Sequence, residues 1–179
     1  MVDLRAYDPD DRPVRVQANS RGELIIDGQE KTIMVHTVPV NVPGKATNAH
    51  AAEDVIGDSI VISVPDDGII LSALGVDNDD ESIEYNIFVF NEPFTATADD
   101  TTFVLVAEDV PKLLGVINVN SFVGTSGVTI GTENNINMPY HTDLGNLYCQ
   151  LVTTGAPNYA AGKELLISFG LWARVRESD

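Results

Sequence analysis

The sequence is poor in cysteine and in long apolar segments, and each shortage narrows what the chain can be. A single cysteine, Cys149, excludes an intrachain disulfide framework and any multi-cysteine metal site. No run approaches the roughly 20 apolar residues that a membrane-spanning helix needs. The acidic N-terminus, MVDLRAYDPDD, lacks the basic and apolar regions of a signal peptide. We therefore expect synthesis in the cytoplasm and no membrane partner.

Basic residues are also scarce. The chain has 10 Lys and Arg residues against 27 Asp and Glu residues, which gives a formal net charge of -17. Such a charge repels the phosphates of nucleic acids and the surface of an anionic membrane alike. We therefore expect no nucleic-acid partner. The charge suits a highly soluble protein that avoids nonspecific self-association.

Helical periodicity is almost missing. From residue 55 onward, short apolar segments alternate with turn residues, a pattern typical of all-β sandwiches. Only EDVPKLLG, residues 108–115, indicates a helix of about two turns, with Asp109 as its cap, Pro111 in its first turn and Gly115 at its end. We predict an all-β fold, most simply a jelly-roll β-sandwich over residues 51–179.

The first 50 residues differ from the rest. Short strand-like pieces at 13–16, 23–26 and 31–40 are separated by charged turns and followed by a loop-like stretch. Hairpins of this size cannot bury enough surface to be stable alone. We therefore predict that residues 1–50 form an extended N-terminal arm with short β-hairpin segments that lies on another surface.

One predicted strand, IEYNIFVFNEPF at residues 83–94, is apolar on both faces along its second half. The face expected to lie in the core carries Ile83, Tyr85, Ile87 and Val89. The other face begins with Glu84 and Asn86 and continues with Phe88 and Phe90. An uncovered aromatic face usually marks an interface. We predict that the arm or an adjoining subunit covers Phe88 and Phe90.

Catalytic patterns are weak throughout. His141 with Asp143, in MPYHTD, is the best acid–base candidate, yet a polar loop explains it better. Cys149 falls on an apolar strand face, which favours a buried, inert thiol over a nucleophile. GTSG at residues 124–127 is not a G-x-S-x-G elbow and is typical of a hairpin loop. We expect no catalytic residue and no enzymatic activity.

Signals for ligands and metals are equally weak, and we expect no cofactor and no metal site. The three histidines, His36, His50 and His141, share no spacing that would make a ligand pair. The acidic loop of residues 77–81 (Asp77, Asn78, Asp79, Asp80, Glu81) has oxygen ligands that suit calcium, but it lacks the spacing and the central glycine of an EF-hand. A solvated loop is the default, and calcium binding stays open.

Aromatic residues leave one further reading. Tyr140, Tyr148, Tyr159 and Trp172 could stack on sugar rings, although positions in the core or at its rim explain Tyr148 and Trp172 better. A glycan- or host-binding β-sandwich module of a head fibre or tail is therefore the alternative function. It predicts that Tyr140, Tyr159 and Trp172 form an exposed cluster.

The order of the strand motifs over residues 55–172 resembles that of tailed-bacteriophage capsid decoration, or cement, proteins of the jelly-roll type. The features that carry the resemblance are an "IG" before the first strand, "FN-x-P" after another, an acidic turn before "x-x-G-x-I", and an "LY" strand. They fall on Ile56 with Gly57, on Asn91 with Pro93, on Asp109 through Ile117, and on Leu147 with Tyr148.

The resemblance implies a structural virion protein on the outer face of the capsid, which it stabilises through subunit interfaces. It implies two partners, the major capsid protein and further copies of this chain in a homotrimer. It brings no catalytic residues. The capsid symmetry site, and whether the arm contacts the shell or a sister subunit, stay open.

Overall fold

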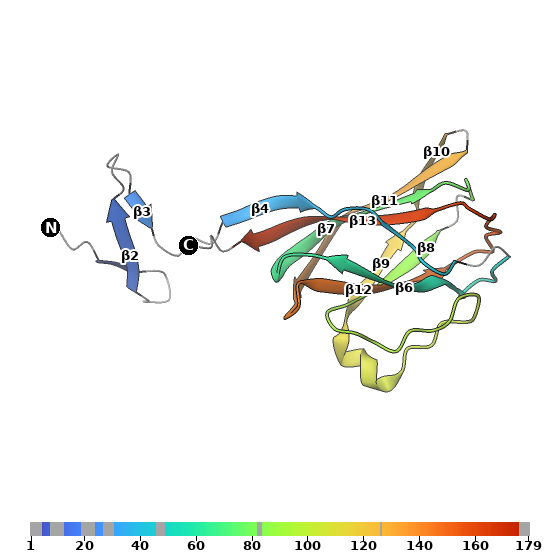
Figure 1. The fold of residues 1–179 in the computed structure, drawn as a ribbon, viewed down its shortest axis with the longest axis horizontal. Coiled ribbons are helices and arrows are strands. Elements are labelled where there is room, and N and C mark those ends of the chain that lie inside the picture. The colour runs from blue at the N-terminus through green and yellow to red at the C-terminus, as the bar shows by residue number, and fades with distance from the viewer. Residues whose placement is uncertain are drawn as a thin grey trace.

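The computed structural model describes residues 5–7, 13–18, 24–26, 31–45, 49–81, 84–125 and 127–175. Two antiparallel sheets stack as a β-sandwich, which confirms the all-β prediction (Figure 1). The described residues contain one helical element, the 3-10 helix η1 (Ala107–Lys112). No described helix is long and apolar enough to span a membrane.

The larger sheet has the strand order β10-β11-β7-β13-β4, and the short strand β5 also pairs with β13. Its strands are β10 (Ser121–Thr125), β11 (Val128–His141), β7 (Asp67–Asp77), β13 (Leu165–Val175), β4 (Lys31–His36) and β5 (Val40–Asn41). The smaller sheet has the order β6-β12-β8-β9. Its strands are β6 (Val55–Ser63), β12 (Asn146–Thr153), β8 (Tyr85–Phe90) and β9 (Leu113–Val119).

The core lies between the two sheets and follows the two-residue alternation of the strands. On β8, Tyr85, Ile87 and Val89 are buried and belong to the core cluster, as the alternation predicts; Ile83 lies outside the described residues. Leu171 on β13 is one of the core residues that the larger sheet contributes from the opposite side. Each sheet therefore has one face that is fixed by the core and a second, outer face.

The sandwich begins earlier in the chain than the predicted boundary at residue 51. Strand β4 pairs with β13 over Lys31 to His36, and β5 pairs with it at Val40 and Asn41. Val42 is buried in the core cluster. The described strands nearer the N-terminus, β1 (Arg5–Tyr7), β2 (Pro13–Ala18) and β3 (Leu24–Ile26), form a small sheet of their own. Residues 31–45 are thus part of the sandwich, whereas the predicted arm had included them.

The predicted helix is shorter than expected and has different ends. Helix η1 follows Val106, which provides no side-chain cap, and Leu113 already begins strand β9. Gly115 therefore lies within a strand. Asp109 accepts hydrogen bonds from the backbone N–H of Thr95, at 2.8 Å, and from the Lys112 ammonium, at 2.7 Å. Its carboxylate fixes the preceding loop instead of capping the helix.

Residues 91–106, here called the strap, cover the part of the smaller sheet's outer face around Phe88 and Phe90, whereas Val61 and Val116 on the same face stay exposed. In Figure 1 the strap runs beneath β6 and β12 on its way to η1. The ring of Phe94 stacks on that of Phe90 with centroids 4.0 Å apart, and Phe103 lies 4.3 Å from Phe88. Phe90 is 0% exposed in the single chain. The cover over Phe90 is therefore the chain's own strap, and the prediction of an arm or an adjoining subunit was wrong.

Hydrogen bonds hold the strap flat on this face. The side-chain amide of Gln150 on β12 accepts from the N–H of Thr97, at 3.0 Å, and donates to its carbonyl, at 2.6 Å. The backbone of Val55 on β6 exchanges hydrogen bonds with Asp100 and Thr101. A segment that is not a strand needs such partners because buried backbone groups without hydrogen bonds are costly. Gln150 itself is fully buried.

The strap makes Phe90 part of the folding core. We expect Phe90→Ala to lower the free energy of unfolding by about 3–5 kcal/mol, the usual cost of truncating a buried phenylalanine. The matched control is Val61→Ala on the outer face of the same sheet, where the side chain is 49% exposed and a change below about 1 kcal/mol is expected. Urea unfolding followed by circular dichroism measures both. Equal losses in the two variants would contradict the assignment of the strap as a cover.

Candidate functional site

His141 lies at the end of β11 between two carboxylates. Its Nδ1 is 2.7 Å from Asp67 on β7, and its Nε2 is 3.3 Å from Asp143. The hydrogen bond and the charge of Asp67, followed by the smaller effect of Asp143, raise the pKa of His141 above its ordinary value. Both ring nitrogens thus face acceptors, which favours an imidazolium that donates two hydrogen bonds. A ring held in this way has no free lone pair to act as a general base.

The pKa of His141 gives a direct test. Because the folded-state pKa is raised, the ion pair stabilises the fold below the ordinary pKa of histidine, and its contribution is lost as pH rises through the raised value. We expect NMR titration to show His141 titrating above its usual range and Asp67→Asn to lower its pKa. The control Asp143→Asn should lower it less. An unshifted His141 in the unmodified protein would refute this arrangement.

Cys149 lies on β12 inside the core and is fully buried. Burial raises the pKa of its thiol well above the ordinary value, because the thiolate cannot be solvated there. These observations agree with the sequence prediction of an inert thiol.

We therefore expect no reaction of Cys149 with a thiol reagent such as DTNB in the folded protein, and one reacting thiol per chain after denaturation. The reaction is followed by absorbance at neutral pH. Stoichiometric labelling before unfolding would show that the core opens at this strand.

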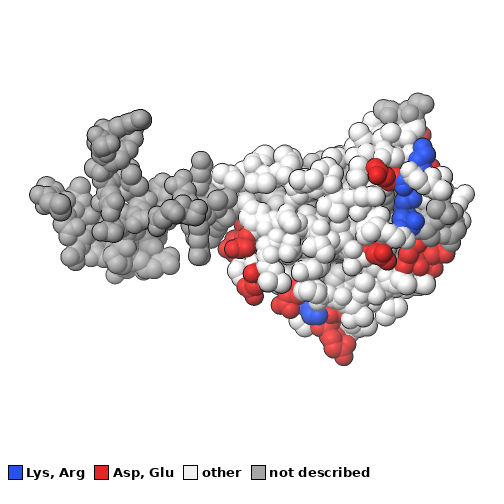
Figure 2. Space-filling model, in the orientation of Figure 1, with Lys and Arg blue, Asp and Glu red and all other residues white. Residues whose placement is uncertain are grey.

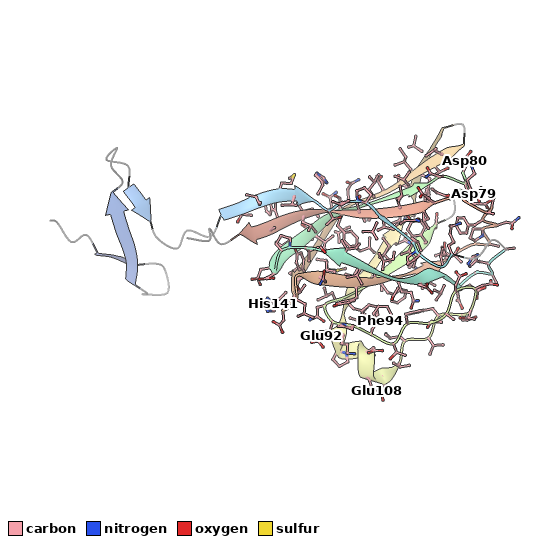
Figure 3. The ribbon with its side chains drawn as sticks, viewed as in Figure 1. Asp79, Asp80, Glu92, Phe94, Glu108 and His141 are labelled. Atoms are coloured by element: carbon pink, nitrogen blue, oxygen red, sulfur yellow. The ribbon has the colours of Figure 1, made fainter. Side chains whose placement is uncertain are left out.

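The acidic loop at residues 77–81 uses its carboxylates on the protein's own backbone. Asp77 accepts from the N–H groups of Asp79, at 2.8 Å, and Glu81, at 3.2 Å. Asp79 accepts from the N–H of Ala160, and Asp80 from the hydroxyl of Thr129. No group of three or more potential metal-ligating side chains occurs among the described residues. The loop thus ties the end of β7 to neighbouring segments, and Figure 3 places Asp79 and Asp80 at the opposite end of the sandwich from His141.

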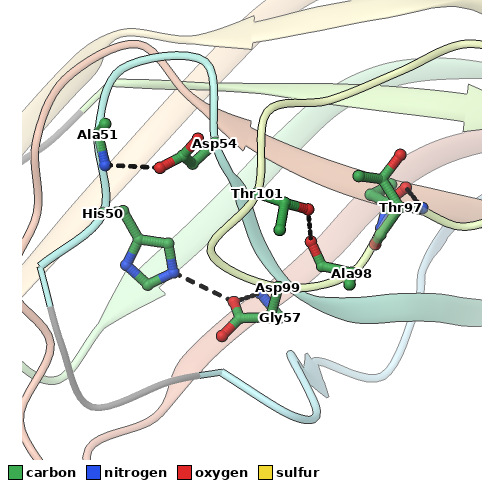
Figure 4. Close-up of polar contacts among 9 residues, drawn as sticks. His50, Ala51, Asp54, Gly57, Thr97, Ala98, Asp99 and Thr101 are labelled. Atoms are coloured by element: carbon green, nitrogen blue, oxygen red, sulfur yellow. Dashed lines mark hydrogen bonds and ion pairs between the residues drawn. The ribbon is translucent and has the colours of Figure 1, made fainter.

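His50 pairs with the strap. Its Nε2 lies 3.1 Å from Asp99, whose carboxylate also accepts a hydrogen bond from the N–H of Gly57 (Figure 4). Gly57 has a positive φ of 71°, which favours glycine, and it sits where β6 shifts register against β12. His50 is buried against the edge of the Tyr159 ring. This pair closes the end of the strap over β6.

The aromatic cluster of the alternative function does not form an exposed surface. Tyr140 and Tyr159 are buried in the core, so neither ring offers a face to a sugar. Tyr148 is half-buried on the outer face of β12, in register with Phe90. Trp172 alone is exposed, at 49%. The prediction that Tyr140, Tyr159 and Trp172 lie together at the surface was wrong.

Trp172 belongs to a broad uncovered surface, the outer face of the larger sheet. The pairing register places Pro139, Ile69, Trp172 and Met34 side by side across four strands. A second row crosses β10, β11, β7 and β13, and it consists of Val123, Ile130, Val76 and Leu166. Between the rows lies Leu74. Where no sheet is named, "the outer face" means this surface of the larger sheet.

The outer face holds a large share of the exposed apolar surface. Eleven large apolar side chains are exposed in the described part of the chain, and five of them lie here: Met34, Leu74, Val123, Ile130 and Trp172. Large contiguous patches of this kind mark interaction sites in soluble proteins. Among the described residues, no segment like the strap covers the larger sheet. The outer faces of the two sheets therefore differ: the chain partly covers that of the smaller sheet and leaves that of the larger sheet open.

Carboxylates are almost absent from the outer face. Among its outward positions, only Asp67 carries a carboxylate, and it lies at the end of β7 in an ion pair with His141. Figure 2 shows acidic side chains along the lower edge and toward the right of the sandwich, while the margin over β4 is uncharged. In a chain of net charge -17, a partner that approaches this face meets one carboxylate, which is already paired with His141.

The sequence points to Trp172 but not to the surface around it. Neighbours on the outer face come from strands far apart in the chain, so only the register of the sheet brings them together. No protein family, curated protein or solved structure matches the chain. The geometry therefore carries the functional argument.

Proposed function

We propose that this chain is a structural virion protein that binds the outer surface of a tailed-phage capsid as a decoration, or cement, protein and stabilises the shell through subunit interfaces. In this proposal the major capsid protein is one partner and further copies of the chain, as a homotrimer, are the other. The carrying observation is the apolar outer face of the larger sheet, with Asp67 as its one carboxylate, because such a face equips the chain for interfaces.

The strand order supports a jelly roll as the fold. With β5 and β10 set aside, the sandwich has eight strands, which pair first with last, second with seventh, third with sixth and fourth with fifth. These pairs are β4 with β13, β6 with β12, β7 with β11, and β8 with β9. Such nesting is the order expected when one long antiparallel hairpin rolls into two sheets.

The residues that carry the resemblance hold the strap and its sheet, which supports reading them as features of a shared fold. Gly57 donates its N–H to Asp99 of the strap. The carbonyl of Pro93 accepts from the Lys112 ammonium at 2.8 Å, and Asp109 holds both Lys112 and the N–H of Thr95. Their arrangement explains why the pattern spans a strand end, a loop and a helix.

The groups best suited to chemistry are engaged in structure. His141 is held by two carboxylates, Cys149 is sealed in the core, and the carboxylates at residues 77–81 accept hydrogen bonds from backbone N–H groups and from the Thr129 hydroxyl. These contacts favour a protein that acts through surfaces over one that acts through a reaction centre.

Binding to capsids tests the proposal. Purified protein is mixed with heads that lack it, and bound protein is measured by co-sedimentation. We expect saturable binding that follows capsid symmetry, and binding lost when residues 1–30 are removed would assign the arm as the clamp. Heads that bind no full-length protein would refute the proposal.

A truncated variant tests binding only if its β-sandwich still folds. Removing residues 1–50 also removes β4, β5 and the buried Val42, so we expect that variant to lose cooperative unfolding. Removing residues 1–30 leaves every strand of the sandwich in place. Circular dichroism of the two variants separates loss of binding from loss of folding.

A further inference from the structure

We propose that the outer face of the larger sheet is where copies of this chain contact one another. This inference rests on the proposed function, since it assigns the surface that builds the homotrimer, and it leaves the rest of the molecule for the capsid. It commits to one occupant, a second copy of the same chain. Three features of this face favour that occupant: its charge, the arrangement of its side chains and its open edge.

Charge selects the occupant. Two copies of a chain with net charge -17 repel each other overall, and the repulsion is smaller where the facing surfaces carry few carboxylates. The outer face meets that condition, because its one carboxylate, Asp67, is paired with His141 at the sheet's end. A basic partner would instead gain most at the acidic surfaces and would have no reason to prefer this face.

Shape fits the same occupant. The outer face is one side of a β-sheet, with Trp172 and Met34 in one row and Val123 and Ile130 in another. Apolar sheet faces can be buried against one another, as the inner faces of the sandwich are, and in a trimer each outer face would divide its contact between two neighbouring copies. Tryptophan is also among the residues most enriched at the energetic centre of protein interfaces.

The edge beside Trp172 is open as well. Strand β4 pairs with β13 on one side, and no described strand pairs with its other side. Its exposed residues Thr32, Met34 and His36 include no acidic side chain. Unpaired edges without carboxylates accept further strands readily. The edge of β4 thus offers a neighbouring copy a second place of contact beside Trp172.

The chain carries its own probe of this contact. Trp172 is its single tryptophan, and it is 49% exposed in one copy, with Met34 beside it at 65%. We expect its fluorescence emission to shift to shorter wavelength, and quenching by acrylamide to fall, as the concentration of full-length protein rises. Sedimentation equilibrium over the same range should show a mass that rises from one copy toward three.

Salt dependence separates this contact from an electrostatic one. Raising the salt from about 0.1 M to about 1 M shortens the Debye length from about 10 to about 3 Å. Because screening weakens the repulsion between copies, we expect association to strengthen. Association that weakens with salt would contradict contact through a face on which apolar side chains predominate.

The deciding variants carry the same charge change on opposite sheets. We expect Trp172→Asp to weaken association by at least roughly 30-fold, as for a central interface tryptophan. Val61→Asp is the control, because Val61 is also 49% exposed but lies on β6 of the smaller sheet. Ile130→Asp gives a second test of the outer face while Trp172 remains as the probe. Circular dichroism and urea unfolding establish that each variant is folded.

Each outcome decides a different question. A monomer at all concentrations, or an oligomer broken by Val61→Asp and not by the outer-face variants, would overturn the inference. Removal of residues 1–30 that exposes Trp172 without changing the mass would also overturn it, because the arm would then be the occupant. A dimer built through the outer face would retain the inference and remove the trimer from the proposed function. If heads bind the protein while it remains monomeric, the proposed decoration function stands and only the inference of contact between copies is refuted.

Discussion

The two hydrogen bonds between the Gln150 amide and the backbone of Thr97 hold the strap on the smaller sheet, and the architecture follows from that contact. A loop has backbone groups that no neighbouring strand satisfies, so it can lie on an apolar face only where side chains supply the partners. Gln150 meets both groups at one position of the strap. With the backbone satisfied there, Phe94 and Phe103 can pack on the rings of β8.

The covered sheet explains why the uncovered one is informative. Both sheets have apolar residues on their outer faces, as strands rich in Val, Ile and Phe tend to have. On the smaller sheet the chain buries Phe90 itself. On the larger sheet Trp172 and Ile130 stay exposed to water, and no described segment covers them as the strap covers Phe90. That asymmetry gives the proposal of an intersubunit face its physical basis.

Local patterns predicted the fold class and much of the core. The two-residue alternation placed Ile87 and Val89 in the core, and the apolar strand around Cys149 predicted a buried thiol; both follow from neighbours in the sequence. The apolar run at residues 103–106 has the composition of a strand, yet it is part of the strap, because Phe103 packs on Phe88 without joining the ladder. An apolar run specifies burial, and it does not specify hydrogen-bonding partners.

Distant pairings could not be predicted. Strand β4 was assigned to the arm because nothing near residues 31–36 indicates that its partner is β13, at the other end of the sequence. The same limit concealed the outer face, whose rows combine residues from four strands. The burial of Tyr140 could not be predicted for a related reason. The alternation of residues along its strand indicates two faces, but only the position of the opposite sheet shows which of them lies in the core.

The pairing of β4 with β13 also bears on how the chain reaches its folded state. During synthesis β4 and β7 emerge well before β13, and they have no shared partner until β13 lies between them. A fold with such separated contacts is expected to close late and slowly, and its sheet edges are exposed to other chains in the meantime. The strong negative charge then acts as a safeguard in the cell: it keeps unfinished chains apart until the last strand completes the sheet.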